Sequence, residues 1–255
     1  MFPLDILVTI GQFAHFAARS LAAAILAIRR PRDFLQQLYE VHVGALPVSI
    51  VGGLALGCII WMHLHGVLVR FGQGNAQLLP QALALAVVLE LGPMGAGLIV
   101  AGRSGASLGA ELGAMRLTEQ IDALEVLGSS PMRTLVGPRV LACMTALPLL
   151  TVKIACLAIA GGFFAERLGG TMPWGEYRNA CLSGLRLEDV VPAILKTIVF
   201  GFLVGVTGCY CGMTATGGTE GVGRAATRGV VYSTFLVVIS DVILVRLIQL
   251  ISAMG

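Results

Sequence analysis

Five long apolar segments constrain the fold of this chain more than any other feature. Each reaches the length of about 20 residues that a helix needs to cross the hydrocarbon core of a bilayer, and they cover 43–69, 77–101, 139–165, 190–213 and 229–254. Charged residues make up 12% of the chain, whereas a soluble domain carries about 25%. Since a segment in lipid must satisfy its backbone hydrogen bonds internally, the sequence predicts an all-α integral membrane protein with five transmembrane helices.

The first 32 residues differ from these spans. Polar side chains recur every three or four residues along them, at Asp5, Thr9, Gln12, His15 and Arg19. A signal peptide is not expected, because the start is acidic and the arginines follow the apolar part. One polar stripe predicts an amphipathic helix over 1–32 that lies in the membrane interface. A sixth span over 13–28 is the alternative, although it is short.

Arginines indicate the orientation, since cytoplasmic loops carry an excess of them. Ten lie in the N-terminal stretch and in the loops 102–139 and 214–229, at Arg19, Arg29, Arg30, Arg32, Arg103, Arg116, Arg133, Arg139, Arg224 and Arg228. Four lie in the loops of the opposite side, at Arg70, Arg167, Arg178 and Arg186. We therefore expect the N-terminus and the 102–139 loop in the cytoplasm. Five spans then place the C-terminus on the outer side.

Small residues follow the second span at intervals of four. A helix through them has one flat face, which lets a neighbouring helix approach closely; the series is Gly97, Ala101, Gly105, Gly109 and Gly113. It runs past the end of the apolar segment into the 102–139 loop. We expect ordinary helix packing along this face, and the second span to continue into the loop as one stiff helix.

The same loop contains a short acidic helix, predicted over 118–127. Thr118 is a suitable N-cap residue, and Gly128 suits the position after the last turn. One face of the helix is apolar and consists of Leu117, Ile121 and Leu124. Because a helix this short is marginal in water without a docking surface, we expect a partner to receive that face. A solvated loop helix is the alternative.

Glu90 is the most unusual polar residue inside a predicted span. A carboxylate within the bilayer is costly and usually faces a cavity or a partner, and Gly92-Pro93 follows it closely. A capped, protonated or paired carboxylate is the structural alternative. Other polar residues within the spans are expected to pair across helices rather than to relay protons: Lys153, Lys196, Asp241 and Arg246.

Several blocks of sequence resemble the MlaE/YrbE family of ABC-transporter permeases. They are ELGP at 90–93, AGRSGASLGAELGAMRLTEQIDALEVLG at 101–128, PRVLA at 138–142 and GVGRAATRGVV at 221–231, with Asp241 in the same order. The resemblance covers about 35–250. Two positions depart from the family pattern: Leu89 stands where many members have Arg, and His65-Gly66-Val67 where members often show Gln-Gly-Tyr.

The resemblance implies a permease domain over 33–255 that moves phospholipids between the inner membrane and the outer envelope. It implies a homodimer, a cytoplasmic ABC ATPase, an MCE-domain protein on the periplasmic side and, as a further candidate partner, a small STAS-type regulator. The acidic helix would be the coupling helix, with contacts from Arg116, Glu119, Ile121, Asp122, Leu124 and Glu125. The lipid cavity between the two copies would be lined by Glu90, Leu54, Leu56, Ile59, Ile60, Leu64, Leu85 and Val88.

An enzyme is the alternative from a different class. Gly102-Arg103-Ser104-Gly105 matches the GxSG sequence of rhomboid intramembrane proteases, but a serine nucleophile needs a base within hydrogen-bond reach, and all four histidines precede this serine. The chain has no phosphate-binding loop of the GxxxxGK[ST] type. We expect no catalytic residue, cofactor, metal or nucleic-acid partner. An ABC permease for another solute is the third possibility.

Overall fold

The computed structural model describes residues 3–70 and 78–252. Within them every regular element is helical, as the sequence predicts: α1 (Pro3–Ala27), α2 (Pro31–Gly44), α3 (Leu46–Arg70), α4 (Leu78–Ala86), α5 (Gly92–Leu117), α6 (Gln120–Val126), α7 (Gly137–Gly169), α8 (Trp174–Ser183), α9 (Leu187–Met213) and α10 (Gly218–Ser252). Two π-helical turns, η2 (Val87–Leu91) and η3 (Met132–Val136), join α4 to α5 and lead into α7. The ends predicted at residues 77 and 254 lie outside the described residues.

Six helical stretches in this part of the chain are long and apolar enough to cross a membrane. Five correspond to the predicted spans, so the all-α membrane fold is confirmed. The sixth is Leu7–Ala27 in α1, which was expected in the interface. Its length and composition permit a crossing, and its interfacial position stays a prediction.

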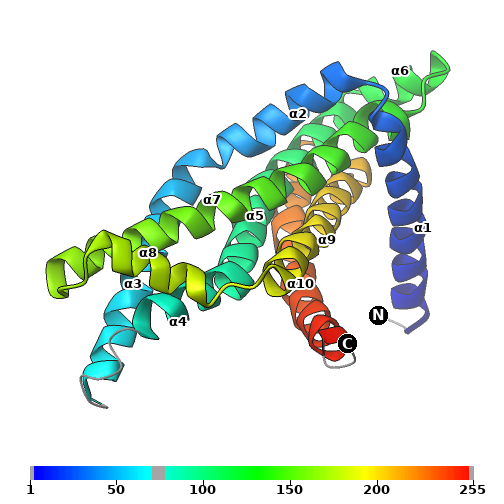
Figure 1. Cartoon of the computed structure of the whole chain (residues 1–255). Helices are drawn as coiled ribbons and strands as arrows, with labels where there is room; N and C mark the ends of the chain where they lie inside the picture. Colours follow the sequence, from blue (N-terminus) through cyan, green and yellow to red (C-terminus); the bar gives the residue numbers. More distant parts are fainter. Residues whose placement is uncertain (1–2, 71–77, 253–255) are drawn as a thin grey trace.

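The helices form a bundle with two distinct ends (Figure 1). The short helix α6 lies at one end, and α8 lies at the other with the start of α9 and the end of α10. We call these the α6 end and the α8 end. The main core lies where α5, α7 and α9 meet, around Val100, Leu112, Leu147 and Phe200.

The small-residue series of α5 lies against α10. A Cβ atom added at Gly105 would lie 3.0 Å from the carbonyl oxygen of Gly229, and one at Gly109 would lie 2.8 Å from that of Ala225. Gly208 and Gly212 of α9 also pack against α5, next to Leu108 and Leu112. Since α5 runs to Leu117, it leaves the apolar core and carries α6 beyond the bundle, as the spacing predicts.

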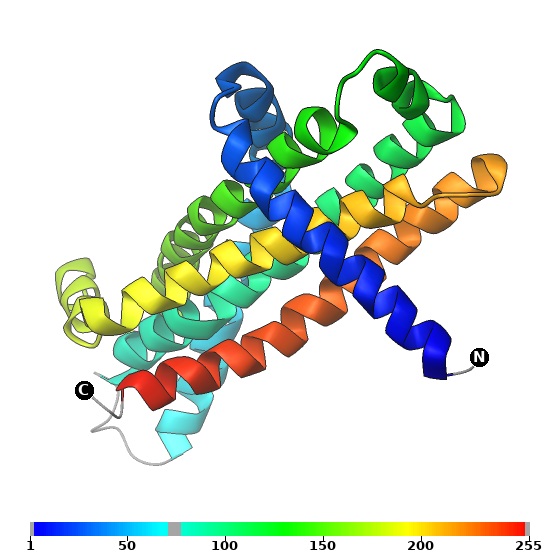
Figure 2. The same cartoon turned by 90° about the vertical axis from the view of Figure 1, so that its right-hand side faces the viewer.

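Helix α1 is the least integrated of the long helices. Its C-terminal half packs on η3 and α7, with Ala23, Ala24 and Ala27 buried. Its N-terminal end stands away from the bundle in both Figure 1 and Figure 2. The helix is therefore anchored at the α6 end, and it crosses the direction of α10 at an angle in Figure 2.

Candidate functional site

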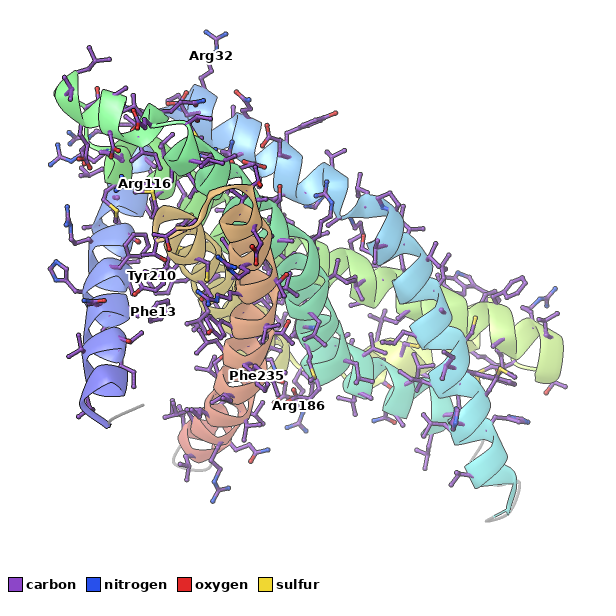
Figure 3. All side chains as sticks on the ribbon, turned by 180° about the vertical axis from the view of Figure 1, so that it is seen from behind. Phe13, Arg32, Arg116, Arg186, Tyr210 and Phe235 are labelled. Atoms are coloured by element: carbon purple, nitrogen blue, oxygen red, sulfur yellow. The ribbon has the colours of Figure 1, made fainter. Side chains whose placement is uncertain are left out.

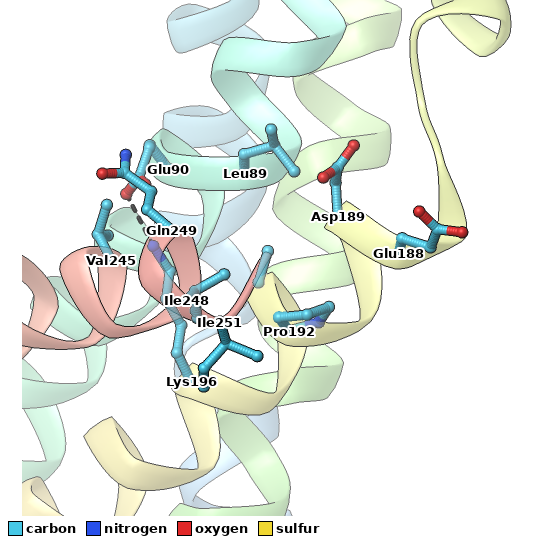
Figure 4. A pocket seen from close by; sticks show the side chains of 11 residues that line it. Leu89, Glu90, Glu188, Asp189, Pro192, Lys196, Val245, Ile248, Gln249 and Ile251 are labelled. Carbon is cyan, nitrogen blue, oxygen red and sulfur yellow. Dashed lines mark hydrogen bonds and ion pairs between the residues drawn. The ribbon is translucent and has the colours of Figure 1, made fainter. Parts of the chain in front are cut away.

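A pocket of about 490 Å³ lies at the α8 end, between η2, the first turns of α9 and the last turns of α10 (Figure 4). Its polar side chains are Glu90, Glu188, Asp189, Lys196 and Gln249. Its apolar part consists of Leu89, Pro192, Ala193, Val245, Ile248 and Ile251. Three carboxylates and one ammonium thus lie beside an apolar wall, an arrangement that suits an amphipathic ligand.

Lys196 connects three helical segments at the inner end of this pocket. Its Nζ donates a hydrogen bond to Glu90 Oε2 at 2.7 Å and forms an ion pair with Asp241 Oδ1 at 3.0 Å, in a geometry outside that of a hydrogen bond. The Lys196 side chain is 2% exposed and that of Asp241 12%, whereas that of Glu90 is 45% exposed. Lys196 is therefore an internal tie, and Glu90 is the member that faces the pocket.

Glu90, Lys196 and Asp241 form a triad that bears on the predicted pairing of polar residues within the spans. Lys196 and Asp241 pair across helices, as predicted, and the alternative of a paired carboxylate holds for Glu90. Sequence reasoning missed that these two pairs share one lysine. Lys153 differs, because its Nζ is buried without a hydrogen-bond partner in the described part of the chain.

The π-helical turn η2 sets the position of Glu90. Pro93 has no backbone N–H and would clash with the preceding turn of a regular α-helix. Here Gly92 N–H bonds to the carbonyl of Val87, five residues earlier, so the helix widens instead of breaking. A Cβ at residue 92 would lie 2.7 Å from the same carbonyl oxygen, which explains why this position needs glycine. Such turns occur frequently at functional sites.

Only Glu90, of the eight residues predicted for the lipid cavity, lines this pocket. Leu56, Ile60, Leu64 and Val88 are partly buried and pack on a second core cluster around Trp61, Leu83 and Val87. Leu85 is also partly buried, while Leu54 and Ile59 are exposed on α3. Leu54 and Ile59 can therefore contact a second copy of the chain or lipid, whereas the four packed side chains stabilise the fold of this chain.

At the α8 end, a buried carboxylate that the sequence analysis did not single out joins α3, α7 and the segment before α8. Glu166 Oε2 accepts a hydrogen bond from Trp61 Nε1 at 2.7 Å, and its Oε1 accepts one from the backbone N–H of Met172 at 3.1 Å. In α8, burial raises the pKa of the Tyr177 hydroxyl and that of the Cys181 thiol, the latter to about 11. Both side chains therefore stay neutral and act as packing groups.

The short acidic helix of the 102–139 loop is α6, at the opposite end of the molecule. Its C-terminus is as predicted: Gly128 has φ +75°, its N–H bonds to Glu125, and Ser129 N–H bonds to Leu124. This pair of bonds is the Schellman motif. The predicted N-cap is wrong, because Thr118 Oγ1 bonds back to the Ala114 carbonyl in α5. The turn instead places Glu119 at φ 59°.

The apolar face of α6 also differs from expectation. Ile121 is fully buried within the chain itself and fixes α6 to the end of α5. Arg116 and Asp122 form an ion pair across the connecting turn. Leu124 is partly buried and Leu117 is exposed, and the most exposed apolar side chains are at the tip, where Val126 is 89% and Leu127 78% exposed. Any partner of α6 would therefore contact this tip, together with the exposed Glu119, Asp122 and Glu125.

Ser104, the residue behind the protease alternative, is buried between α5 and α2. Within the described residues no hydrogen bond joins it to any histidine. His65 stacks on Trp61, His63 Nδ1 lies 2.9 Å from the Ile59 carbonyl, and burial and Lys153 lower the pKa of His42, which lies against α7. The described residues therefore give Ser104 no histidine as a general base.

Comparisons with known proteins agree with the architecture. The family model described as Permease MlaE matches residues 34–247. A probable ABC transporter permease protein of Rickettsia typhi is 32% identical over 240 residues, which cover 94% of this chain and 92% of the relative. One of Synechocystis is 32% identical over 210 residues, with coverage of 82% and 79%. The chloroplast protein of Arabidopsis thaliana named Trigalactosyldiacylglycerol 1 is 35% identical over 213 residues, covering 84% of this chain and 60% of that protein.

Proposed function

The chain belongs to the MlaE family of ABC transporter permeases, and from this premise we propose that it moves phospholipids between the inner membrane and the outer envelope. The Glu90 pocket is the observation that carries the substrate class. Its carboxylates and Lys196 lie beside an apolar wall, which matches a molecule with a charged head and apolar chains. The name of the Arabidopsis relative is that of a diacylglycerol glycolipid, which supports a lipid with two acyl chains and does not specify a phosphate.

The charges of the pocket favour one kind of headgroup. Glu90, Glu188 and Asp189 outnumber the one ammonium of Lys196, which Glu90 and Asp241 already neutralise. An anionic headgroup would be repelled, whereas a headgroup with its own ammonium would be attracted. We therefore propose a zwitterionic phospholipid as the preferred substrate. A small polar solute fits less well, because much of the lining is apolar.

A second copy of the chain would complete the cavity. Leu54 and Ile59 on α3, and a long row of apolar side chains on α10, are exposed in one copy. A homodimer through these faces would enclose the lipid path that the resemblance implies. The excess of arginines at the α6 end supports a cytoplasmic position for that end. The Glu90 pocket would then face the periplasm and an MCE-domain protein there.

A photo-crosslinking experiment tests the substrate. Crosslinking amino acids placed at Ile248 in the pocket, Ile59 on α3 and Leu149 on the exposed face of α7 would be compared in proteoliposomes. We expect Ile248 to capture more phospholipid than Leu149, because the pocket holds lipid specifically. Equal capture at these two sites would mean ordinary bilayer lipid and would remove the lipid proposal. Capture at Ile59 no greater than at Leu149 would remove α3 from the cavity wall.

We further propose that α6 is the contact with the ATPase subunit, which hydrolyses ATP for the complex. Its exposed apolar tip and acidic sides support this role, because a partner that covers Val126 and Leu127 would remove their apolar surface from water. Val126→Asp should abolish co-purification of the ATPase and leave membrane insertion intact. Leu187→Asp, at another strongly exposed apolar position, at the α8 end, is the matched control. Unchanged co-purification with Val126→Asp would exclude the tip as the dock.

The protease alternative has a simple test of its own. Ser104→Ala removes a small packing hydroxyl and should leave transport near the wild-type level. Loss of a proteolytic activity on this substitution would restore that alternative.

A further inference from the structure

One buried arginine joins three helical segments at the α6 end, the end opposite to the Glu90 pocket. The side chain of Arg139 in α7 is 11% exposed. Its Nη1 donates a hydrogen bond to the Leu135 carbonyl in η3 at 3.1 Å, and its Nη2 donates one to Glu111 Oε2 in α5 at 3.4 Å. Arg139 therefore links η3 and the beginning of α7 to the part of α5 that leads to α6.

The contact between Arg139 and Glu111 is incomplete in this structure. A hydrogen bond between a guanidinium and a carboxylate normally has a length of about 2.7–2.9 Å, and the two groups frequently form two parallel bonds. Here one bond of 3.4 Å is present, and Arg139 Nε is buried without a hydrogen-bond partner in the described part of the chain. A buried donor without a partner is costly. A closer approach of Glu111, which would pair its carboxylate with both Nε and Nη2, would remove this cost.

Glu111 has space in which to move. Its side chain is 41% exposed and lines a pocket of about 400 Å³ between α2 and α5. Ser107 Oγ, from the same helix, donates a hydrogen bond of 2.6 Å to Glu111 Oε1. The ion pairs of Lys196 at the other end of the molecule differ, because that ammonium meets its two carboxylates at 2.7 and 3.0 Å. The pair of Arg139 and Glu111 is therefore the looser of the two charge clusters.

The pair lies close to the end of α5 that holds α6. Glu111 precedes Leu117, the last residue of α5, by about 9 Å along the helix at 1.5 Å per residue. Arg116 in the last turn forms an ion pair with Asp122 of α6, and Figure 3 shows Arg116 at the end of the molecule opposite to that of Arg186. A movement of α6 would therefore reach Glu111 through less than two turns of continuous helix.

On its other side, Arg139 is fixed to the π-helical turn η3. Leu135 lies within this turn, and a Cβ at Gly137 directly after it would lie 2.6 Å from the Ala23 carbonyl oxygen of α1. The pair thus stands between the helix that leads to α6 and the turn that contacts α1. Its closure would change how α5 is held against η3 and α7.

We propose that Arg139 and Glu111 couple α6 to the rest of the permease: the ion pair is half formed in this structure and closes to two bonds when the ATPase subunit binds ATP and moves α6. The proposal rests on α6 being the contact with the ATPase. Arg139 is a positioning residue, because neither it nor Glu111 lines the Glu90 pocket. Closure holds α5 to α7 at the α6 end in the ATP-bound state, and ATP hydrolysis releases them.

The first test uses the native transporter with its ATPase. Hydrogen exchange of the backbone amides at 132–137 would be compared without nucleotide and with a non-hydrolysable ATP analogue. Closure adds a hydrogen bond between two charged groups beside η3, so exchange should be roughly tenfold slower with the analogue. Equal exchange in the two states would overturn the proposal.

Variants in proteoliposomes separate this role from a purely structural one. Glu111→Gln removes the charge and keeps the shape, so the lipid moved per ATP hydrolysed should fall roughly tenfold while the ATPase still co-purifies. Arg139→Lys, which keeps the charge and lacks the fork, should have the same effect. Glu40→Gln is the matched control, since Glu40 lines the same pocket and forms no ion pair with Arg139 among the residues that the structure describes.

The coupling role and the docking role of α6 fail in different ways. If α6 is not the dock, Val126→Asp leaves the ATPase bound. If the pair does not couple α6 to the permease, Val126→Asp still releases the ATPase, but Glu111→Gln leaves the lipid moved per ATP unchanged. Loss of the ATPase with Glu111→Gln, or an equal loss of transport with Glu40→Gln, would show a structural role and overturn the proposal.

Discussion

Two Gly-Pro sequences, Gly92-Pro93 and Gly137-Pro138, follow π-helical turns of the same length. In each, the glycine N–H bonds to a carbonyl five residues earlier, at Val87 and Met132 respectively. The proline explains both turns, since a regular helix would clash with its ring. The local structure is therefore the same in the two places.

The surroundings of the two turns differ. At η2 the turn presents Glu90 to Lys196 and to the pocket at the α8 end. At η3, near the α6 end, Arg133 is exposed and the turn supports α1: a Cβ at Gly137 would lie 2.6 Å from the Ala23 carbonyl oxygen. The turn η2 thus positions the charged side chain of Glu90, and η3 supports the helix α1. The Gly-Pro sequence determines the π-helical turn, whereas the neighbouring helices determine what the turn does.

The largest expected effect on stability comes from removing the ammonium of Lys196, which pairs with Glu90 in η2. Lys196→Met leaves the Asp241 carboxylate buried and unpaired, which should cost about 3–5 kcal/mol of unfolding free energy. Thermal unfolding in detergent measures it. Adding Glu90→Gln and Asp241→Asn to Lys196→Met should recover much of the loss. Arg133→Met in the second turn, an exposed site, should stay within about 0.5 kcal/mol of the native chain.

At η3, the stability of the protein should fall when a methyl group is added at Gly137. Gly137→Ala forces α1 away from α7, because the new Cβ meets backbone at Ala23, and such overpacking costs about 1–3 kcal/mol. Faster proteolysis between α1 and α2 would report the release of α1. Gly95→Ala, where a Cβ meets nothing within 4 Å, serves as the control. Equal resistance of the two variants would contradict the role of η3 as the support of α1.

Glu90→Gln should change function more than stability. Lys196 keeps Asp241 as its partner, and Glu90 is partly exposed, so the loss of unfolding free energy should be about 1 kcal/mol. Lipid-stimulated ATPase activity of the complex should fall clearly. Glu188→Gln changes a carboxylate of the same pocket that has no ion pair with Lys196 in the structure, and should affect activity less. A larger stability loss than with Lys196→Met would contradict the central position of the lysine.

The smallest change in stability is expected from the prolines. Pro93→Ala and Pro138→Ala each restore an N–H donor and should alter the unfolding free energy by less than about 1 kcal/mol. If η2 relaxes to a regular helix, Glu90 turns by about 100° relative to α5 and leaves Lys196, so activity should fall for Pro93→Ala alone. Hydrogen exchange of the backbone amides at 87–93 and at 132–138 measures whether each π-helical turn relaxes to a regular helix. Equal loss of activity in both variants would remove the distinction between the two turns.

Local sequence rules account for much of the fold. The lengths of the apolar segments predicted five spans, because a helix satisfies all of its backbone hydrogen bonds internally in lipid. Gly128 predicted the end of α6, because glycine tolerates positive φ. The same rules were wrong for Thr118, which is the C-cap residue of α5 and bonds back to Ala114 in that helix. They also left α1 between two interpretations, since a moderately apolar helix suits both an interface and a crossing.

What the sequence alone determined is the five long apolar helices and the small residues that let them meet, because these follow from spacing along one chain; α2 and α8 were not predicted. The tertiary structure decided which side chains meet across it. It placed Lys196 between Glu90 and Asp241, which lie far apart in the sequence. It buried Ile121 where α6 meets the end of α5 and left Val126 exposed. Such pairings depend on how whole helices pack, and no periodicity within a single segment records that.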